Sequence, residues 1–282
     1  MIARRATPAD MAALATRAIA PTPGRHVLVA DDGGTVAGAA IYGDQPFETD
    51  QLGIKTARLD VLRCWTDAAV LDPLVAAAWD DLKGSGVDLV SCRVSENDRA
   101  ALDSLQGNGF RVVECLLTHG RPLDDAPRAL PDGIERGGAS NAEACAEIAR
   151  RAFAYDRFHA DPRIPDAAAD RLKGQWMRNA CAGRADAVLV ALEGGRVVGF
   201  NACLLAGDRA VIDLIAVAET AQGRGWGRKL VDGALACYAG KAAEMRVGTQ
   251  SRNLASLALY RACGFAVVDT AMTLHAHLGK HA

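Results

Sequence analysis

Residues 211–230 read VIDLIAVAETAQGRGWGRKL, and this stretch decides the fold. It opens with an apolar, strand-like run and then reaches a loop with glycine at alternate positions, Gly223, Gly225 and Gly227. Glycine lets the backbone take up positive φ and approach a ligand closely. A helical pattern follows at once, and the free N–H groups and positive dipole end of a helix N-terminus suit a pyrophosphate. The stretch therefore predicts a phosphate-binding turn between a strand and a helix.

Two other phosphate-binding loops do not match this turn. The dinucleotide fingerprint GxGxxG needs glycine at position 228 or 230, where Arg228 and Leu230 stand. The P-loop pattern GxxxxGK[ST] also fails, because the Gly-Lys pairs at 240 and 279 lack both the upstream glycine and the following Ser or Thr. A glycine-rich turn that binds nothing is the alternative that the bare motif leaves open.

The composition is that of a folded protein with an ordinary surface. Of the 282 residues, 50% are hydrophobic and 23% are charged, and the formal net charge is -2. This length predicts two domains, and the charge balance argues against a nucleic-acid partner, which needs a basic face. Eight cysteines occur without any CxxC pair, which argues against a metal site or a disulfide framework. We find no apolar run of about 18 residues, so we expect a cytoplasmic protein without a membrane partner.

The chain contains an internal repeat. Residues 87–117, VDLVSCRVSENDRAALDSLQGNGFRVVECLL, follow the same strand, helix, Gly-Phe and strand pattern as residues 244–274, EMRVGTQSRNLASLALYRACGFAVVDTAMTL. A repeat of this size indicates duplicated domains, which we place at 1–125 and 126–282. The segment 121–133, RPLDDAPRALPDG, carries Pro122, Pro127 and Pro131 without apolar periodicity, so we interpret it as a linker.

The second half predicts an α+β domain. We expect helices at 142–153, 167–182 and 229–238, and strands at 187–192, 196–205 and 209–218. The turns between these strands, Glu193-Gly194-Gly195 and Gly207-Asp208, favour hairpins. An antiparallel meander that leads into a phosphate-loop helix is unlike the strict alternation of a doubly wound sheet.

Two motifs together resemble those of the GNAT superfamily of N-acetyltransferases. The first is the loop pattern Gln/Arg-x-x-Gly-x-Gly/Ala, and the second is an Asn followed seven residues later by Tyr and then by Gly-Phe. The matching residues are Gln222, Gly225, Gly227, Asn253, Tyr260, Gly264 and Phe265. The resemblance covers residues 133–278. It implies two tandem GNAT-like domains, each with a mixed, mostly antiparallel sheet flanked by helices.

The resemblance also implies an acyltransferase that uses acetyl-CoA as co-substrate and attacks its thioester directly in a ternary complex, with no metal. Tyr260 is the expected general acid, because a phenol that titrates near pH 10 keeps its proton at neutral pH. A backbone N–H of the preceding strand is the expected oxyanion donor. The expected acetyl-CoA-binding residues are Ile215, Ala216, Val217, Gln222, Gly223, Arg224, Gly225, Trp226, Gly227, Arg228 and Asn253.

A narrower resemblance concerns the acceptor. Residues 150–180, RRAFAYDRFHADPRIPDAAADRLKGQWMRNA, resemble a segment of the dTDP-fucosamine acetyltransferase group, which acetylates an amine of a nucleotide-linked deoxysugar. The resemblance implies a small-molecule amine substrate, such as a nucleotide-linked amino sugar. The candidate substrate contacts are Arg157, Phe158, His159, Asp161 and Asp213. An amino acid, a polyamine or an antibiotic as acceptor, a homodimer, and a non-catalytic CoA-binding regulatory module stay open as alternatives.

The first half lacks the residues of an acyl-CoA site. Residues 54–83 contain no glycine, so the phosphate turn is missing there. In the repeat alignment Asp98 corresponds to Asn253, and Leu105 corresponds to Tyr260. We therefore expect a degenerate GNAT-like domain without an acyl-CoA site at 1–125.

Overall fold

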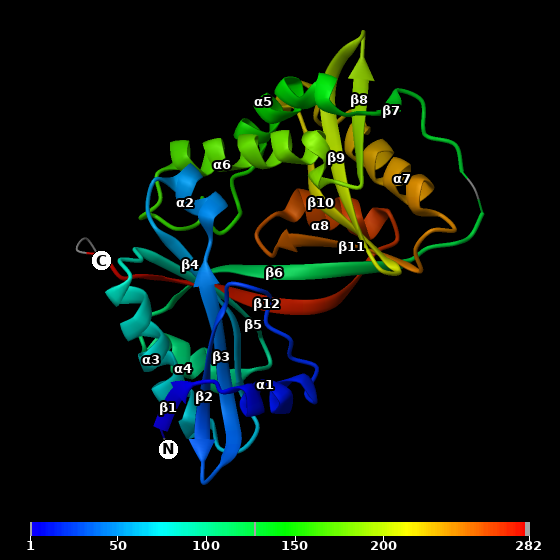
Figure 1. Ribbon diagram of the computed structural model, residues 1–282. Helices are drawn as coiled ribbons and strands as arrows, with labels where there is room; N and C mark the ends of the chain where they lie inside the picture. Colours follow the sequence, from blue (N-terminus) through cyan, green and yellow to red (C-terminus); the bar gives the residue numbers. More distant parts are fainter. Residues whose placement is uncertain (1, 127, 280–282) are drawn as a thin grey trace. The chain divides into compact units, whose positions relative to one another are not determined.

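The computed structural model describes residues 2–126 and 128–279 (Figure 1). The chain divides into two compact units. Unit 1 comprises Met1–Val113 and Ala271–Ala282, and unit 2 comprises Glu114–Thr270. Within the described ranges, no helix has the length and apolar character needed to cross a membrane. Pro127 of the expected linker lies outside the described residues.

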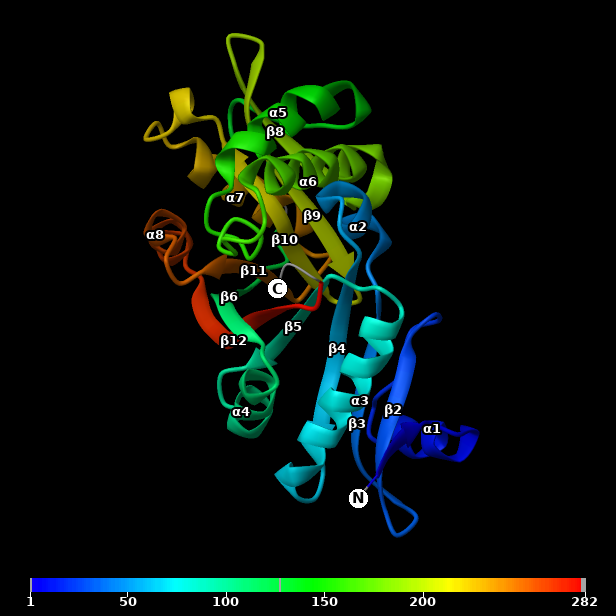
Figure 2. The ribbon, with the colours of Figure 1, turned by 90° about the vertical axis from the view of Figure 1, so that its left-hand side faces the viewer.

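Unit 1 is a mixed sheet with helices on both faces. Its strands are β1 Ile2–Arg5, β2 His26–Asp32, β3 Thr35–Asp44, β4 Thr56–Cys64 and β5 Leu89–Ser95, and its helices are α1 Pro8–Ala15, α2 Pro46–Leu52, α3 Leu71–Gly84 and α4 Arg99–Gly107. Figure 2 shows α3 lying along β3 and β4. Leu74 of α3 and Leu105 of α4 pack into the main core, whereas Leu14 of α1 packs with Val29 in a smaller core cluster.

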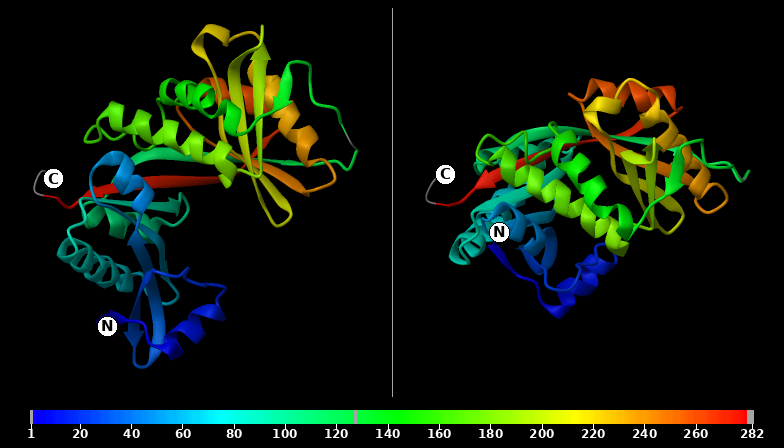
Figure 3. Two further views of the ribbon diagram at one scale, coloured as in Figure 1. Left: turned by 45° about the horizontal axis from the view of Figure 1, so that its top comes forward. Right: turned by 90° about the horizontal axis from the view of Figure 1, so that it is seen from above.

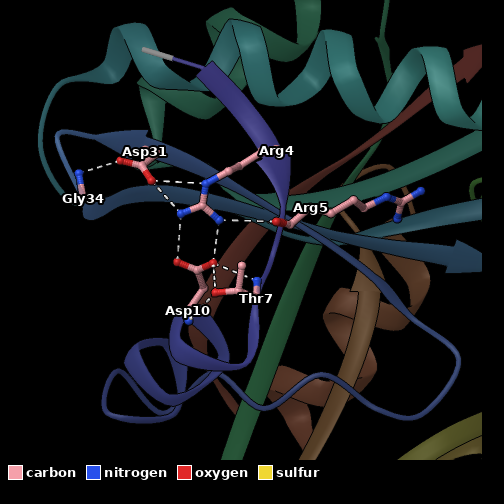
Figure 4. A network of polar contacts seen from close by, with 6 residues as sticks. All are labelled: Arg4, Arg5, Thr7, Asp10, Asp31 and Gly34. Carbon is pink, nitrogen blue, oxygen red and sulfur yellow. Dashed lines mark hydrogen bonds and ion pairs between the residues drawn. The ribbon is translucent and has the colours of Figure 1, made fainter.

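A polar network ties the start of the chain to unit 1 (Figure 4). The Arg4 guanidinium lies 2.6 Å from Asp10 and 2.5 Å from Asp31, so it joins α1 to β2. Asp10 also accepts from the Thr7 backbone N–H at 2.7 Å, and Thr7 caps α1 in return. Arg4, with these Thr7 hydrogen bonds, holds the pKa of the Asp10 carboxyl well below its ordinary value. Thr7 and Asp10 therefore fix the start of α1.

Unit 2 has the meander and helices that the sequence predicts. Its elements are β6 Arg111–Pro122, β7 Ile134–Arg136, α5 Ala142–Ala152, α6 Asp166–Asn179, β8 Ala187–Glu193, β9 Arg196–Ala206, β10 Arg209–Val217, α7 Trp226–Tyr238, β11 Glu244–Gln250, α8 Leu254–Ala262 and β12 Ala266–His277; β6 starts and β12 ends in unit 1. Side chains alternate across the sheet. Val190 and Phe200 pack towards α5 and α6, which lie side by side (Figure 3), whereas Leu189 and Ile212 pack towards α7.

Strands β6 and β12, which follow the two Gly-Phe pairs, exchange places: each pairs with a strand from the other half of the sequence. Residues 116–122 of β6 pair antiparallel with β11, so the sheet of unit 2 runs β6-β11-β10-β9-β8-β7. Residues 271–277 of β12 pair antiparallel with β5, so the sheet of unit 1 runs β1-β2-β3-β4-β5-β12. The compact units thus differ from consecutive segments 1–125 and 126–282, which stay a prediction about the duplication. A sequence repeat shows that a strand exists, but not which sheet accepts it.

Candidate functional site

Strands β10 and β11 separate partway along their length. They pair in parallel only from Arg209 with Glu244 to Ile212 with Val247, whereas β10 stays paired with β9 as far as Val217. The register of the β9 pairing shifts at Asp213, where β10 bulges. Beyond the bulge, β10 therefore presents an edge that is not paired with β11.

Alternation of the backbone shows which amides lie on this edge. The N–H of Ala218 donates to Val198 of β9 at 2.8 Å. Because successive amides of a strand point in opposite directions, the N–H of Ala216 also points to β9, whereas those of Ile215 and Val217 point to the opened side. The expected oxyanion-donor strand therefore offers Ile215 and Val217 as donors, and Ala216 contributes only its side chain to this region.

The opening between the strands is a cleft of about 620 Å³. It is lined by parts of β10, the glycine turn, the start of α7, the end of β11 and one face of α8. Among the expected residues, those that line it are Ile215, Ala216, Val217, Gln222, Gly223, Gly225, Trp226, Gly227, Asn253, Tyr260 and Asp213. The two predicted motifs, which begin at Gln222 and Asn253, are thus brought to one cavity.

The glycine turn has the backbone conformation that its sequence predicts. Gly223 has a φ of 75° and Gly225 a φ of 83°, both in the left-handed region that favours glycine. Gly225 is the N-cap of α7, and the first hydrogen bond of that helix runs from the Lys229 N–H to the Gly225 carbonyl at 3.1 Å. The amides of residues 226–228 precede that bond and have no partner within the helix. This is the arrangement of donors that binds phosphate groups.

The polar side chains of the turn differ in whether they line the cleft. The Gln222 Nε2 donates to the carbonyl oxygen of Val217 at 3.2 Å and so ties the turn to the end of β10. Arg224 and Arg228 do not line the cleft among the described residues. Arg224 forms an ion pair with Glu193, and Arg228 belongs to the first turn of α7, where it pairs with Asp232. The glycine turn therefore lines the cleft through Gln222, Trp226 and its glycines, and the expected contribution of the two arginines stays a prediction.

Gly227 brings α7 close to α8. A Cβ at Gly227 would lie 3.3 Å from Leu259 of α8, a tight contact. The first turn of α7 therefore packs directly on α8, the helix that carries Tyr260.

Asn253 and Tyr260 occupy one side of the cleft. The Asn253 Oδ1 accepts from the Ser256 N–H at 3.1 Å and caps α8, as the sequence predicts. Tyr260 lies two turns further along and is 2% exposed. Its ring packs against the rings of His119 and Phe265, with centroids 5.7 and 5.9 Å away. Burial raises the pKa of Tyr260, so its hydroxyl stays protonated at neutral pH.

His119 is a site neighbour that sequence reasoning missed. It lies on β6, opposite Val247 of β11, and is buried. Burial lowers the pKa of His119, so the imidazole beside Tyr260 is neutral at physiological pH. No motif marks this histidine, because its place depends on β6 joining the sheet of unit 2.

Asp213 is the candidate acceptor residue that reaches the cleft. It receives a hydrogen bond from the Trp176 Nε1 at 3.1 Å and from the Arg184 Nη1 at 2.6 Å. The carboxylate is therefore neutralised by Arg184 and tied to α6 by Trp176. These contacts make it a fixed wall of the cleft.

The other four candidates, Arg157, Phe158, His159 and Asp161, do not line the cleft among the described residues. This corrects the expected set of substrate contacts. Phe158 and Asp161 are buried. The loop folds inward around its acidic residues, so the lining comes instead from their neighbours Asp156 and Lys173. Of the charged residues in this segment, Asp156, Asp161 and Lys173 are buried, whereas Arg163, Asp166 and Arg171 are exposed.

His159 is held between two carboxylates. Its Nδ1 lies 2.6 Å from Asp156 and its Nε2 lies 3.1 Å from Asp170. Burial by itself would lower the pKa of His159, but the hydrogen bonds and charges of these carboxylates outweigh it and raise the pKa. Burial opposes ionisation of Asp156, yet Lys173 and His159 lower its pKa. The histidine thus organises the loop and is not free to act as a base.

One known family matches this part of the chain. The model of the acetyltransferase (GNAT) family matches residues 143–265, which span α5 to Phe265. The chain is also similar to the spore coat polysaccharide biosynthesis protein SpsD of Bacillus subtilis (strain 168), with 30% identity over 141 residues. That alignment covers 50% of this chain and 49% of the relative, so the chain matches about half of the length of the relative.

Solved structures share the fold over nearly the whole chain. A GCN5-related N-acetyltransferase from Sphaerobacter thermophilus aligns with a TM-score of 0.65 and 18% identity, over 98% of this chain and 95% of the other. A tandem GNAT protein from the clavulanic acid biosynthesis pathway aligns with a TM-score of 0.61 and 17% identity, over 98% of this chain and 90% of the other. At these identities the likeness shows the fold, which is α+β as the sequence predicts.

Proposed function

We propose that the chain is an acetyltransferase with an acyl-CoA donor and that its acceptor is the primary amine of a nucleotide-linked amino sugar. Residues 143–265, which match the model of the acetyltransferase (GNAT) family, support this proposal. The observation that carries the proposal is the convergence of a glycine turn, an unpaired strand edge and Tyr260 on one cleft. The similarity to a polysaccharide biosynthesis protein supports a sugar acceptor.

The donor binds through backbone groups. The pyrophosphate of acetyl-CoA accepts hydrogen bonds from the amides of the glycine turn and the first turn of α7. The pantetheine arm lies along the opened edge of β10, where it takes the place of β11 as a hydrogen-bonding partner. This places the thioester carbonyl near the amides of Ile215 or Val217, which stabilise the oxyanion that forms during attack.

The acceptor amine attacks the thioester carbon directly. A C–N bond forms and the C–S bond breaks, the nitrogen loses one proton, and the sulfur gains one. Because its pKa is raised by burial, Tyr260 does not give up its proton to a free thiolate in a separate downhill step. It donates its hydroxyl hydrogen to the sulfur as the C–S bond breaks, and the proton lost by nitrogen returns through water to the phenol.

A thiol-release assay tests this proposal. The full chain is mixed with acetyl-CoA and a panel of primary amines, including nucleotide-linked amino sugars, free amino sugars, amino acids and polyamines. We expect release of CoA above the rate of spontaneous hydrolysis, with the largest kcat/KM for a nucleotide-linked amino sugar. A larger kcat/KM for an amino acid or a polyamine would contradict the acceptor assignment while leaving the acetyltransferase activity in place.

A further inference from the structure

Lys173 is a buried cation on the wall of the cleft. It belongs to α6, is 7% exposed, and lies on the helix face that also buries Ala169 and Met177. A lysine is almost never so deeply buried unless its ammonium group is paired. Lys173 nevertheless lines the same cavity as Tyr260 and the glycine turn.

The ammonium group of Lys173 is incompletely satisfied. Its nitrogen lies 5.0 Å from the ring centroid of Phe153, 5.2 Å from that of Trp176 and 6.0 Å from that of Phe158. Its ion pair with Asp156 spans 3.6 Å, which is longer than a hydrogen bond. In the part of the chain that the structure describes, the Lys173 ammonium makes this ion pair and has no hydrogen-bond acceptor.

Asp156 cannot easily come closer to supply that acceptor. One of its oxygens accepts from the Phe158 N–H at 3.1 Å, and the other is bound to the His159 Nδ1 at 2.6 Å. Both contacts fix the carboxylate in the loop. An ammonium with unused donors on the wall of a cleft favours a ligand that brings an oxygen atom.

Lys173 and the glycine turn are linked to different residues of β10. Trp176, one helical turn from Lys173, donates to Asp213 at the bulge of β10. The glycine turn is tied to Val217 at the end of the same strand. Four residues of extended strand span about 13 Å. Lys173 is therefore linked through Trp176 to the Asp213 end of this strand segment, whereas the glycine turn is linked to its Val217 end.

We propose that Lys173 binds an oxyanion of the acceptor, a phosphoryl or carboxylate group, and thereby selects acceptors that carry one. The inference rests on the proposed function, because it names the part of the acceptor that this site recognises. A cation in an aromatic cage repels the acceptor's own ammonium, so it recognises another part of the molecule. A desolvated ammonium–oxyanion contact is a strong, charge-assisted hydrogen bond.

Matched acceptors test the proposal. Glucosamine 6-phosphate is compared with glucosamine, and an amino acid with its amide, in the thiol-release assay with wild type and Lys173→Met. We expect wild type to favour an anionic member by at least about tenfold in kcat/KM. Lys173→Met should remove that preference, because it lowers kcat/KM for the anionic member about tenfold more than for the uncharged member. The pair that shows the effect tells whether the oxyanion is phosphoryl or carboxylate.

Two further variants control this experiment. Arg171→Met removes an exposed cation from the same helix and should leave the preference unchanged. Lys173→Arg keeps the charge and should retain part of the preference. Thermal unfolding and acetyl-CoA affinity establish that each variant folds. An equal loss of kcat/KM for charged and uncharged acceptors in Lys173→Met, or no preference in wild type, would overturn the proposal.

Binding separates this inference from the proposed function. Calorimetry follows glucosamine 6-phosphate titrated into the CoA-bound protein, which needs no turnover. Binding that Lys173→Met weakens at least about tenfold supports the oxyanion site even if the acceptor panel releases no thiol. Binding of equal strength in both proteins would contradict the site even if acetyl transfer is efficient.

Discussion

Helices α4 and α8 have the same backbone surroundings, but they carry different side chains at the positions of Asp98 and Asn253 and of Leu105 and Tyr260. The Asp98 side chain accepts from the N–H three residues ahead at 3.2 Å, and the Asn253 side chain does the same at 3.1 Å. Each helix is followed by a glycine of positive φ, 88° at Gly109 and 79° at Gly264. Before each helix a pair of parallel strands stays together for only four residue pairs. The backbone that opens a cleft in unit 2 therefore exists in unit 1 as well.

In unit 1, other side chains occupy the positions that correspond to the cleft of unit 2. Arg63 of β4, at the position of Ala216 in β10, forms an ion pair with Asp98 at 3.0 Å. Leu105 stands where unit 2 has Tyr260 and is fully buried. The connection from β4 to α3 has no glycine turn. The two units therefore share a backbone but not the side chains to which we assign acetyl transfer, and our proposal requires the turn, the open strand edge and the phenol together.

The largest expected effect comes from removing the phenol of unit 2. Tyr260→Phe should lower kcat by about 100- to 10,000-fold, the usual worth of a positioned general acid. The affinity for acetyl-CoA, measured by calorimetry, should stay within about twofold of wild type. Tyr238→Phe is the matched control, because its hydroxyl bonds to Asp186 outside the cleft lining. A Tyr260→Phe variant with a kcat like that of the control would show that the Tyr260 hydroxyl is not the general acid.

The glycine turn should give the next largest effect. Gly225→Val places a β-branched side chain at a φ of 83°, which distorts the turn and misaligns the amides. We expect the Kd for acetyl-CoA to rise by at least about tenfold, the worth of one or two charge-assisted hydrogen bonds. Gly33→Val in the β2–β3 hairpin, at a φ of 63°, imposes similar strain in unit 1 and should leave the Kd unchanged. An equal rise in both variants would mean that the turn has no special part in binding.

The polar networks of the two units should respond to opposite ends of the pH range. The pKa of His159 is raised in the folded state, so its contribution to stability is fully present below about pH 6.5 and is lost as the pH rises through the folded pKa. The pKa of Asp10 is lowered, so its contribution is present above about pH 3.9 and is lost as the pH falls further.

Denaturant unfolding at several pH values measures both effects. The difference in unfolding free energy between wild type and His159→Gln should be largest below about pH 6.5 and shrink as the pH rises through the raised pKa of the folded state. The difference for Asp10→Asn should stay level from about pH 5 to 8 and shrink below about pH 4. A His159→Gln difference that grows with pH would show that the histidine is neutral between its carboxylates.

The smallest effects should come from the matched caps. Asn253→Ala and Asp98→Ala each remove the side chain that caps the following helix, at a cost of about 1 kcal/mol in the free energy of unfolding. Only Asn253 lines the cleft, so only its replacement should also lower kcat/KM. Loss of activity in Asp98→Ala without unfolding would contradict the inactive role of unit 1.

Much of the fold follows from local patterns in the sequence. The meander and the helix starting at Ala142 are set by turn chemistry and apolar periodicity, and the structure confirms them. The glycine turn is equally local, because positive φ at Gly223 and Gly225 requires glycine. These features need no knowledge of distant partners.

The rest depends on contacts between distant segments. The sequence does not tell which sheet β6 joins, so it does not place His119 beside Tyr260. The charges of residues 156–173 resemble those of a solvated surface, although Asp156 and Lys173 are buried. One signal was present, since Lys173 falls at the helical spacing of the apolar face between Ala169 and Met177.

A crystal structure of the acetyl-CoA complex tests the central claim most directly. We expect the diphosphate oxygens to lie within about 2.7–3.2 Å of the amides of residues 223–228, with the sulfur facing the Tyr260 hydroxyl and unit 1 empty of CoA. A diphosphate bound elsewhere, a phenol turned away from the sulfur, or a second CoA between β4 and β5 of unit 1 would contradict the account.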